Sequence, residues 1–171
     1  MKASVLSLDD ATSPYVIKTP TTSTTYNYQV VFDDAQNYAW FEIDASQISN
    51  DAHIGISKFS GHTDSKWEIV LGGWSGSRSV LRDRNGGNEL AASEHGTSFW
   101  RRVKDQLVVS VKNGFIEVYA HNELLLKHED PSIKVDELNY LLVSSGWGAS
   151  GTWTIKARKY EGDLFMTEQI L

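Results

Sequence analysis

The 171-residue sequence carries a formal net charge of −6 and contains no cysteine, which excludes disulfides, thiolate metal sites and a cysteine nucleophile. No apolar run approaches the roughly 20 residues that a membrane-spanning helix needs, and the length suits one domain over residues 1–171. Its basic clusters, Arg78–Arg84 and Arg101–Arg102, are too short for a phosphate-binding track, so we expect no nucleic-acid partner.

Alternation of apolar and polar residues, the mark of a half-buried β-strand, begins in Thr25–Phe32, where Tyr26, Tyr28, Val30 and Phe32 share one face. The same period of two follows along most of the chain, in Tyr38–Ala45, Trp67–Leu71, Leu107–Val111, Phe115–Tyr119, Glu123–Lys127, Tyr140–Val143 and Trp153–Ala157. Between two of these segments Asn113-Gly114 is a strong hairpin signal.

Ten to twelve short strands at this spacing predict an all-β fold, a two-sheet antiparallel β-sandwich of jelly-roll-like type. The helical period is missing except for one turn at Asp136–Leu138, so a doubly wound α/β domain is excluded. The alternation predicts a core that includes Phe41, Ile43, Ile54, Ile69, Leu71, Val109, Val111 and Ile155.

The segment Trp67–Arg82 combines a strand, the paired glycines Gly72-Gly73, Trp74 and a returning strand. Glycines let a backbone come close to a ligand, so one interpretation has Trp74 and Arg82 lining a pocket. In the other interpretation Trp74 packs over the end of the sandwich and has no ligand.

A second glycine-flanked tryptophan, Trp147, lies in Gly146–Gly151 between two predicted strands. An exposed ring in such a turn suits an aromatic stacking platform for a ligand. The alternative is a ring folded back on the rim of the sheet.

A third group lies on the face opposite Phe41 and Ile43, where Trp40, Glu42 and Asp44 are predicted to point outward. Aromatic and acidic residues on an outer sheet face resemble a sugar-binding face. They equally suit an ordinary solvated surface.

The five histidines show neither HxH nor HExxH spacing, and no Gly-x-Ser-x-Gly elbow occurs. A carboxylate pair such as Glu42 and Glu68 would suit glycoside hydrolysis only if the structure brought the two side chains close together. Calcium is the more plausible cofactor, since the oxygen-rich segment Asp83–Glu94 offers hard ligands. Within it, Asp83 and Asn85 are also candidate partners for ligand hydroxyls.

Four segments form a recognisable combination: Asp51–Ser57, Trp67–Arg82, Phe99-Trp100 and Trp147–Trp153. Together they resemble the domain family named after farnesoic acid O-methyltransferase, and the resemblance covers about residues 25–158. The family name implies methyl transfer from S-adenosylmethionine to farnesoic acid. The main class of such enzymes uses a Rossmann-like sheet with a glycine-rich turn, and this sequence shows neither.

We therefore expect a carbohydrate-binding, lectin-like module that is not an enzyme, with Trp74, Arg82, Asp83, Asn85 and Trp147 as ligand-binding residues. Trp40 and Glu42 form the alternative site on the sheet face. A methyltransferase and a protein-interaction module stay open as alternatives. Homo-oligomer formation and a cytoplasmic or secreted location stay open too, because Met1–Asp10 lacks a signal-like apolar run but a mature secreted chain would as well.

Overall fold

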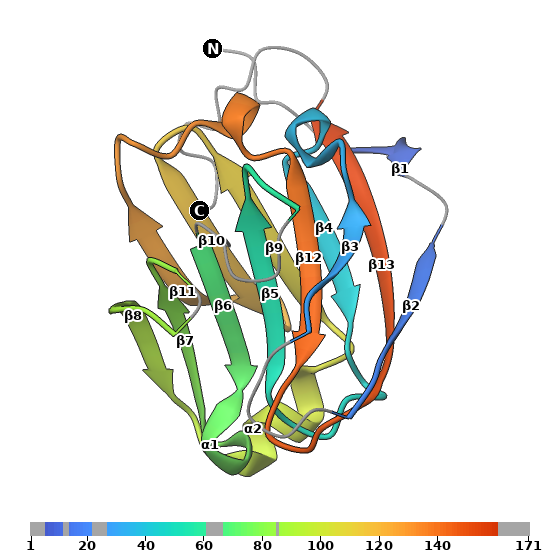
Figure 1. Cartoon of the computed structure of the whole chain (residues 1–171), viewed down its shortest axis with the longest axis vertical. Helices are drawn as coiled ribbons and strands as arrows, with labels where there is room; N and C mark the ends of the chain where they lie inside the picture. Colours follow the sequence, from blue (N-terminus) through green and yellow to red (C-terminus); the bar gives the residue numbers. More distant parts are fainter. Residues whose placement is uncertain (1–5, 12–13, 22–26, 61–66, 85, 161–171) are drawn as a thin grey trace.

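The computed structural model describes residues 6–11, 14–21, 27–60, 67–84 and 86–160, which form two stacked sheets (Figure 1). Sheet A has the strand order β1-β13-β4-β9-β10-β11, with β2 also paired to β13, and sheet B has the order β3-β12-β5-β6-β7-β8. Every strand pair among the described residues is antiparallel. The predicted all-β antiparallel sandwich is confirmed.

The strands of sheet A are β1 (Leu6–Ala11), β2 (Tyr15–Thr19), β4 (Trp40–Asp44), β9 (Leu107–Lys112), β10 (Phe115–Ala120), β11 (Glu123–Glu129) and β13 (Gly151–Tyr160). Those of sheet B are β3 (Gln29–Phe32), β5 (Ala52–Ser57), β6 (Trp67–Gly72), β7 (Arg78–Arg82), β8 (Glu89–Glu94) and β12 (Tyr140–Ser145). The short helical elements are η1 (Ala35–Asn37), α1 (Gly73–Gly76), α2 (Thr97–Val103) and η2 (Val135–Glu137). None of the described helices is long and apolar enough to cross a membrane.

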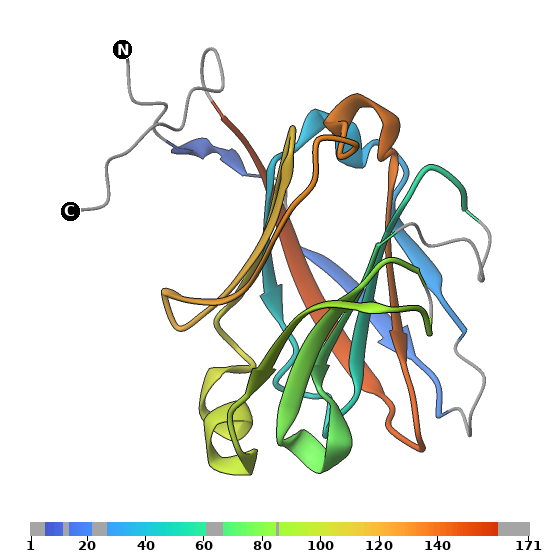
Figure 2. The ribbon, with the colours of Figure 1, turned by 90° about the vertical axis from the view of Figure 1, so that its left-hand side faces the viewer.

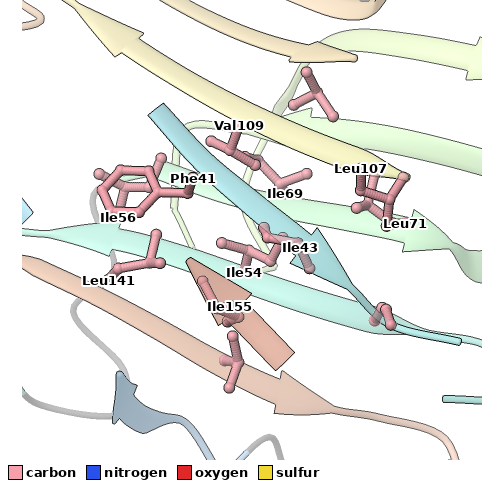
Figure 3. Packing of buried hydrophobic residues seen from close by; sticks show 14 of the residues in the cluster. Phe41, Ile43, Ile54, Ile56, Ile69, Leu71, Leu107, Val109, Leu141 and Ile155 are labelled. Carbon is pink, nitrogen blue, oxygen red and sulfur yellow. The ribbon is translucent and has the colours of Figure 1, made fainter. Parts of the chain in front are cut away.

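Between the sheets lies one hydrophobic cluster to which both contribute (Figure 3). All eight residues predicted for the core belong to it and are buried. Their position follows from the strand period, since Phe41 and Ile43 point inward while the intervening Glu42 is half-exposed.

The predicted strand Thr25–Phe32 differs from the observed one. Its described part begins as a strand at Gln29, and Tyr26 lies outside the described residues. Val31 and Phe32 are buried, whereas Val30 is only half-buried, so Val30 and Phe32 do not simply share one buried face. A register shift against β12, between Leu141 and Leu142, breaks the alternation.

Strand β6 also departs from simple alternation, because all six of its residues are buried. Ile69 and Leu71 face the core, whereas Glu68 and Val70 are buried on the opposite, outer side of sheet B. Buried polar residues outside the core mark this face as unusual, since a solvated sheet face would leave them exposed.

Helix α2 has no counterpart in the sequence-based expectations. It buries Trp100 and Val103, which lie three residues apart. The helix has only seven residues, and a helical period cannot be recognised in so short a segment. The predicted turn Asp136–Leu138 is found one residue earlier, as η2. The second half of the oxygen-rich segment Asp83–Glu94 is not among the predicted strands, yet Glu89–Glu94 forms strand β8, because it pairs with β7.

Candidate functional site

Helix α1 and the β12–β13 connection lie at the same end of the sandwich (Figures 1 and 2). Near this end, a cavity of about 520 Å³ opens on the outer face of sheet B. It is lined by Asn50, Asp51, His53, Val70, Trp74, Ser75, Arg82 and Trp147. Its volume lies within the range of about 300–1,000 Å³ that is typical of small-ligand sites.

The two tryptophans of the cavity come from different connections and adopt unusual backbone conformations. Trp74 (φ 50°) and Trp147 (φ 51°) are both in the left-handed region. Such a conformation costs a non-glycine residue about 1–2 kcal/mol. Trp74 is 46% exposed and Trp147 is 61% exposed, so burial of the rings does not offset this backbone cost.

Trp74 is positioned by its neighbours on β7. The guanidinium carbons of Arg78 and Arg82 lie 4.8 Å and 5.7 Å from the centre of its ring. Cation–π contacts of this kind contribute about 0.5–1 kcal/mol at exposed positions. They hold the ring beside the cavity while leaving part of it open to a ligand.

The α1 turn that carries Trp74 rests on α2. Gly72 (φ +61°) lies against the indole of Trp100, and a Cβ at Gly72 would come within 2.3 Å of that ring. Trp100 is itself anchored, since its Nε1 donates to the Ser49 carbonyl at 3.3 Å. Gly72 therefore has a structural role, close packing on α2, in addition to allowing the turn.

Asp51 connects the two tryptophan loops through its backbone. Its N–H donates to the Gly72 carbonyl and its carbonyl accepts from the Gly146 N–H, both at 3.2 Å. It too has a positive φ, 49°, a conformation that Asp tolerates better than most residues. One residue thereby fixes the start of the Trp74 turn against the start of the Trp147 turn.

The Asp51 side chain lines the cavity and faces His53. His53 Nε2 lies 3.9 Å from Asp51 Oδ1, and His53 Nδ1 lies 3.7 Å from Glu68 Oε2. Burial lowers the pKa of His53, but the interactions with both carboxylates outweigh burial and raise the pKa above its ordinary value. The raised pKa favours the protonated form of this imidazole, which lies between two buried acids.

Glu68 is fully buried and surrounded by donors. The Tyr28 hydroxyl donates to it at 2.6 Å, Arg82 Nη1 at 3.1 Å and the Gly86 N–H at 3.2 Å. Burial raises the pKa of Glu68, yet the interactions with His53 and Tyr28 reverse this and lower it. The charged carboxylate thus holds Arg82 and His53, which both line the cavity.

The structure brings together three of the residues predicted to bind ligand, Trp74, Arg82 and Trp147. Asp83 does not line this cavity, because its carboxylate accepts from the backbone and side-chain amides of Asn88 at 2.9 Å and 3.3 Å. Asn85 lies outside the described residues.

Trp40 and Glu42 point outward, as their alternation predicted, and the structure places them on sheet A. They line a separate groove of about 460 Å³ on the outer face of sheet A. Trp40 stacks on Tyr119 with ring centres 6.0 Å apart, and Glu42 pairs with Arg158 at 2.6 Å. This groove and the tryptophan cavity are distinct sites.

Sequence reasoning missed Asn50, Asp51, His53, Val70 and Ser75. A signal was available for part of this set, because Asp51 and His53 belong to one of the family-like segments and His53 alternates with Ile54. Their meeting with Glu68 depends on the pairing of β5 with β6, which no local pattern specifies.

Two carboxylates of the oxygen-rich segment Asp83–Glu94 are already paired with an arginine. Arg78 pairs with Glu89 at 2.6 Å and with Glu94. Across the described residues, no group of three or more His, Asp or Glu side chains is arranged to hold a metal ion. A calcium requirement stays a prediction.

A family model described as farnesoic acid O-methyl transferase matches residues 20–159, most of the chain. The chain belongs to this family. The match extends the resemblance seen in the sequence and includes every residue that lines the tryptophan cavity. No curated protein sequence matches the chain at a significant level.

Solved structures with a similar arrangement include sheep galectin-11, at 10% identity and a TM-score of 0.46, covering 78% of this chain and 99% of the other. A CBM40 module of a Ruminococcus gnavus sialidase, bound to α2,6-sialyllactose, has 8% identity and a TM-score of 0.40, covering 84% and 91%. A fructofuranosidase of Aspergillus kawachii has 13% identity and a TM-score of 0.44, covering 94% and 29%. At these identities and scores, none of the three assigns a ligand to this chain.

Replacing His53 by Gln is expected to destabilise the fold by about 3–5 kcal/mol near neutral pH. The buried Asp51 carboxylate loses the basic group that faces it, and Glu68 keeps only Arg82. The folded-state pKa of His53 is raised, so its stabilising contribution is complete below the unfolded pKa, about 6.5. The contribution is lost as pH rises through the raised folded value. Urea unfolding between about pH 5.5 and 9 measures the difference in unfolding free energy between wild type and His53→Gln, and this difference should decrease as pH rises. The control is the same substitution at the exposed His121. A difference that stays constant with pH would contradict this account.

Replacing Gly72 by Ala should cost more than about 2 kcal/mol, since it adds a collision with Trp100 to an unfavourable positive φ. Gly148→Ala is the matched variant, because Gly148 also has a positive φ (+80°) but no atom within 4 Å of an added Cβ. Chemical denaturation should show a clearly smaller loss for it, about 1 kcal/mol. Equal losses would mean that the contact with Trp100 has no energetic weight.

Proposed function

We propose that this chain is a carbohydrate-binding module and that its ligand occupies the cavity between Trp74 and Trp147. The observation that carries the proposal is the convergence of two exposed tryptophans, from separate connections, on one cavity with charged hydrogen-bonding side chains. Sugars present apolar C–H faces that stack on aromatic rings and hydroxyls that need both donors and acceptors.

The energetic cost of placing these two rings at the surface also supports a ligand-binding role. Two exposed indoles in left-handed turns stabilise the fold little and cost backbone strain. Strain of this kind concentrates at functional sites, where surrounding contacts hold it in place. Here the backbone of Asp51 and the packing of Gly72 on Trp100 supply those contacts.

The polar lining suits hydroxyl groups. Asp51 accepts hydrogen bonds, Arg82 donates them, and the amide of Asn50 does both. Asn50 Nδ2 already donates to Asp51 Oδ2 at 2.6 Å, and Glu68 holds Arg82, so these groups are oriented before a ligand arrives. Such preorganisation reduces the entropic cost of binding.

A glycan array tests the proposal, using wild type beside Trp74→Ala and Trp147→Ala. Each variant should weaken glycan binding tenfold or more, because it removes a stacking contact together with the area that the contact buries. Stability should fall by less than about 1 kcal/mol, since the rings are exposed. Running the array with calcium and with a chelator tests the metal requirement separately.

Two control variants sharpen the array. Trp153→Ala removes a fully buried ring and should cost about 3–5 kcal/mol of stability. Trp40→Ala probes the alternative site on sheet A; if it abolishes glycan binding while Trp74→Ala does not, the ligand lies in that groove. If the loop variants unfold as readily as Trp153→Ala, these tryptophans are packing residues. An array without any bound glycan would favour the protein-interaction alternative.

The family description supports a second candidate, methyl transfer. The main class of S-adenosylmethionine enzymes binds its cofactor at the carboxyl ends of parallel strands, whereas the described strands here pair only antiparallel. We therefore expect no micromolar binding of S-adenosylmethionine to the purified chain in isothermal titration calorimetry. A clear isotherm would favour the methyltransferase over the carbohydrate-binding module.

A further inference from the structure

A second cavity adjoins the tryptophan cavity at the same end of the sandwich. It has a volume of about 330 Å³ and is lined by Ser49, Asn50, Ser75, Gly76, Thr97, Trp100 and Arg101. Asn50 and Ser75 line both cavities, so the two are contiguous along the α1 turn. Helices α1 and α2 are adjacent at this end (Figure 2).

The two cavities differ in charge. Around the tryptophan cavity, Arg82 pairs with Glu68, and Arg78 pairs with Glu89 and Glu94. His53 lies between Asp51 and Glu68. Each of these three basic side chains already faces a carboxylate, so an acidic sugar placed there would find no unpaired cation among them.

The adjoining cavity, in contrast, is lined by a positively charged side chain, that of Arg101. Arg101 is exposed, and within the described part of the chain no carboxylate forms an ion pair with it. The remaining lining includes the hydroxyls of Ser49, Ser75 and Thr97, which are neutral. A guanidinium free of a carboxylate can form two parallel charge-assisted hydrogen bonds with an anionic group.

From this asymmetry we propose that the adjoining cavity is a second subsite, which binds an anionic substituent through Arg101 while a neutral sugar unit stacks between Trp74 and Trp147. The inference rests on the proposed function and adds to it the class of ligand and its orientation. The ligand is an oligosaccharide of at least two units with a carboxylate or sulfate at one end, and its acidic end lies toward α2.

The test uses an array of neutral oligosaccharides beside the same structures with a terminal sialic acid or with a sulfate ester. Wild type should bind one or both acidic series about tenfold more strongly than the neutral series, and the preference should shrink at high salt. The two acidic series distinguish a carboxylate from a sulfate.

Arg101→Gln should abolish the acidic preference and leave binding of the neutral series unchanged. Arg101→Lys, which keeps the charge but loses the bidentate geometry, should retain part of it. Arg102→Gln is the matched control, because Arg102 is an exposed neighbour on α2 that does not line the cavity, and it should keep the full preference.

The outcomes separate the two proposals. Equal binding of neutral and acidic series by wild type, or an acidic preference that survives Arg101→Gln, overturns the second subsite and leaves the carbohydrate-binding function standing. Loss of the preference in Arg102→Gln as well would overturn the assignment to Arg101, since a general surface charge would then explain it. Failure of every series to bind would overturn the carbohydrate-binding function itself and the subsite with it.

Discussion

The two hydrogen bonds made by the peptide groups of Asp51 hold the candidate site together. They join the start of the Trp74 turn to the start of the Trp147 turn. Neither tryptophan ring is inserted into the core, where it would define the position of its turn, because both residues are largely exposed. Without this link, the separation of the two rings would depend on two independent loops. The positive φ of Asp51 is part of the same arrangement, since it directs the N–H and the carbonyl toward different connections.

Beneath these loops, a charged network replaces the apolar packing expected on a sheet face. His53, Glu68 and Arg82 come from three neighbouring strands, β5, β6 and β7, and each lines or supports the cavity. Burying such charges is costly unless each has a partner, and here each carboxylate faces a cation while Tyr28 supplies a further donor. Hydrophobic residues at these positions would satisfy the fold at lower cost. The network is therefore better explained by the orientation it gives to the side chains around the cavity than by stability alone.

The same network bears on the proposed recognition of a ligand. The arginines beside Trp74 are already paired with carboxylates, so an anion would find less attraction there than a neutral hydroxyl group would. Arg101 on α2, which has no ion pair among the described residues, lines the adjoining cavity instead. A ligand with a neutral and an acidic part would thus bind in one direction only. The family name gives no indication of this, since it describes a reaction rather than a surface.

The sequence by itself determined the architecture, because a period of two assigns each side chain to one face of its own strand. Phe41, Ile43 and Ile155 were identified as core residues on that basis, and Trp74 and Trp147 as side chains of glycine-flanked turns. It did not reveal that these two rings share a cavity, that Trp40 lies on the other side of the sandwich, or that His53 meets Glu68. Those relations arise from pairings between distant segments, such as β5 with β6 and β12 with β5. Alternation constrains the face of a strand but leaves its neighbours in the sheet unspecified, and only the tertiary structure decided them.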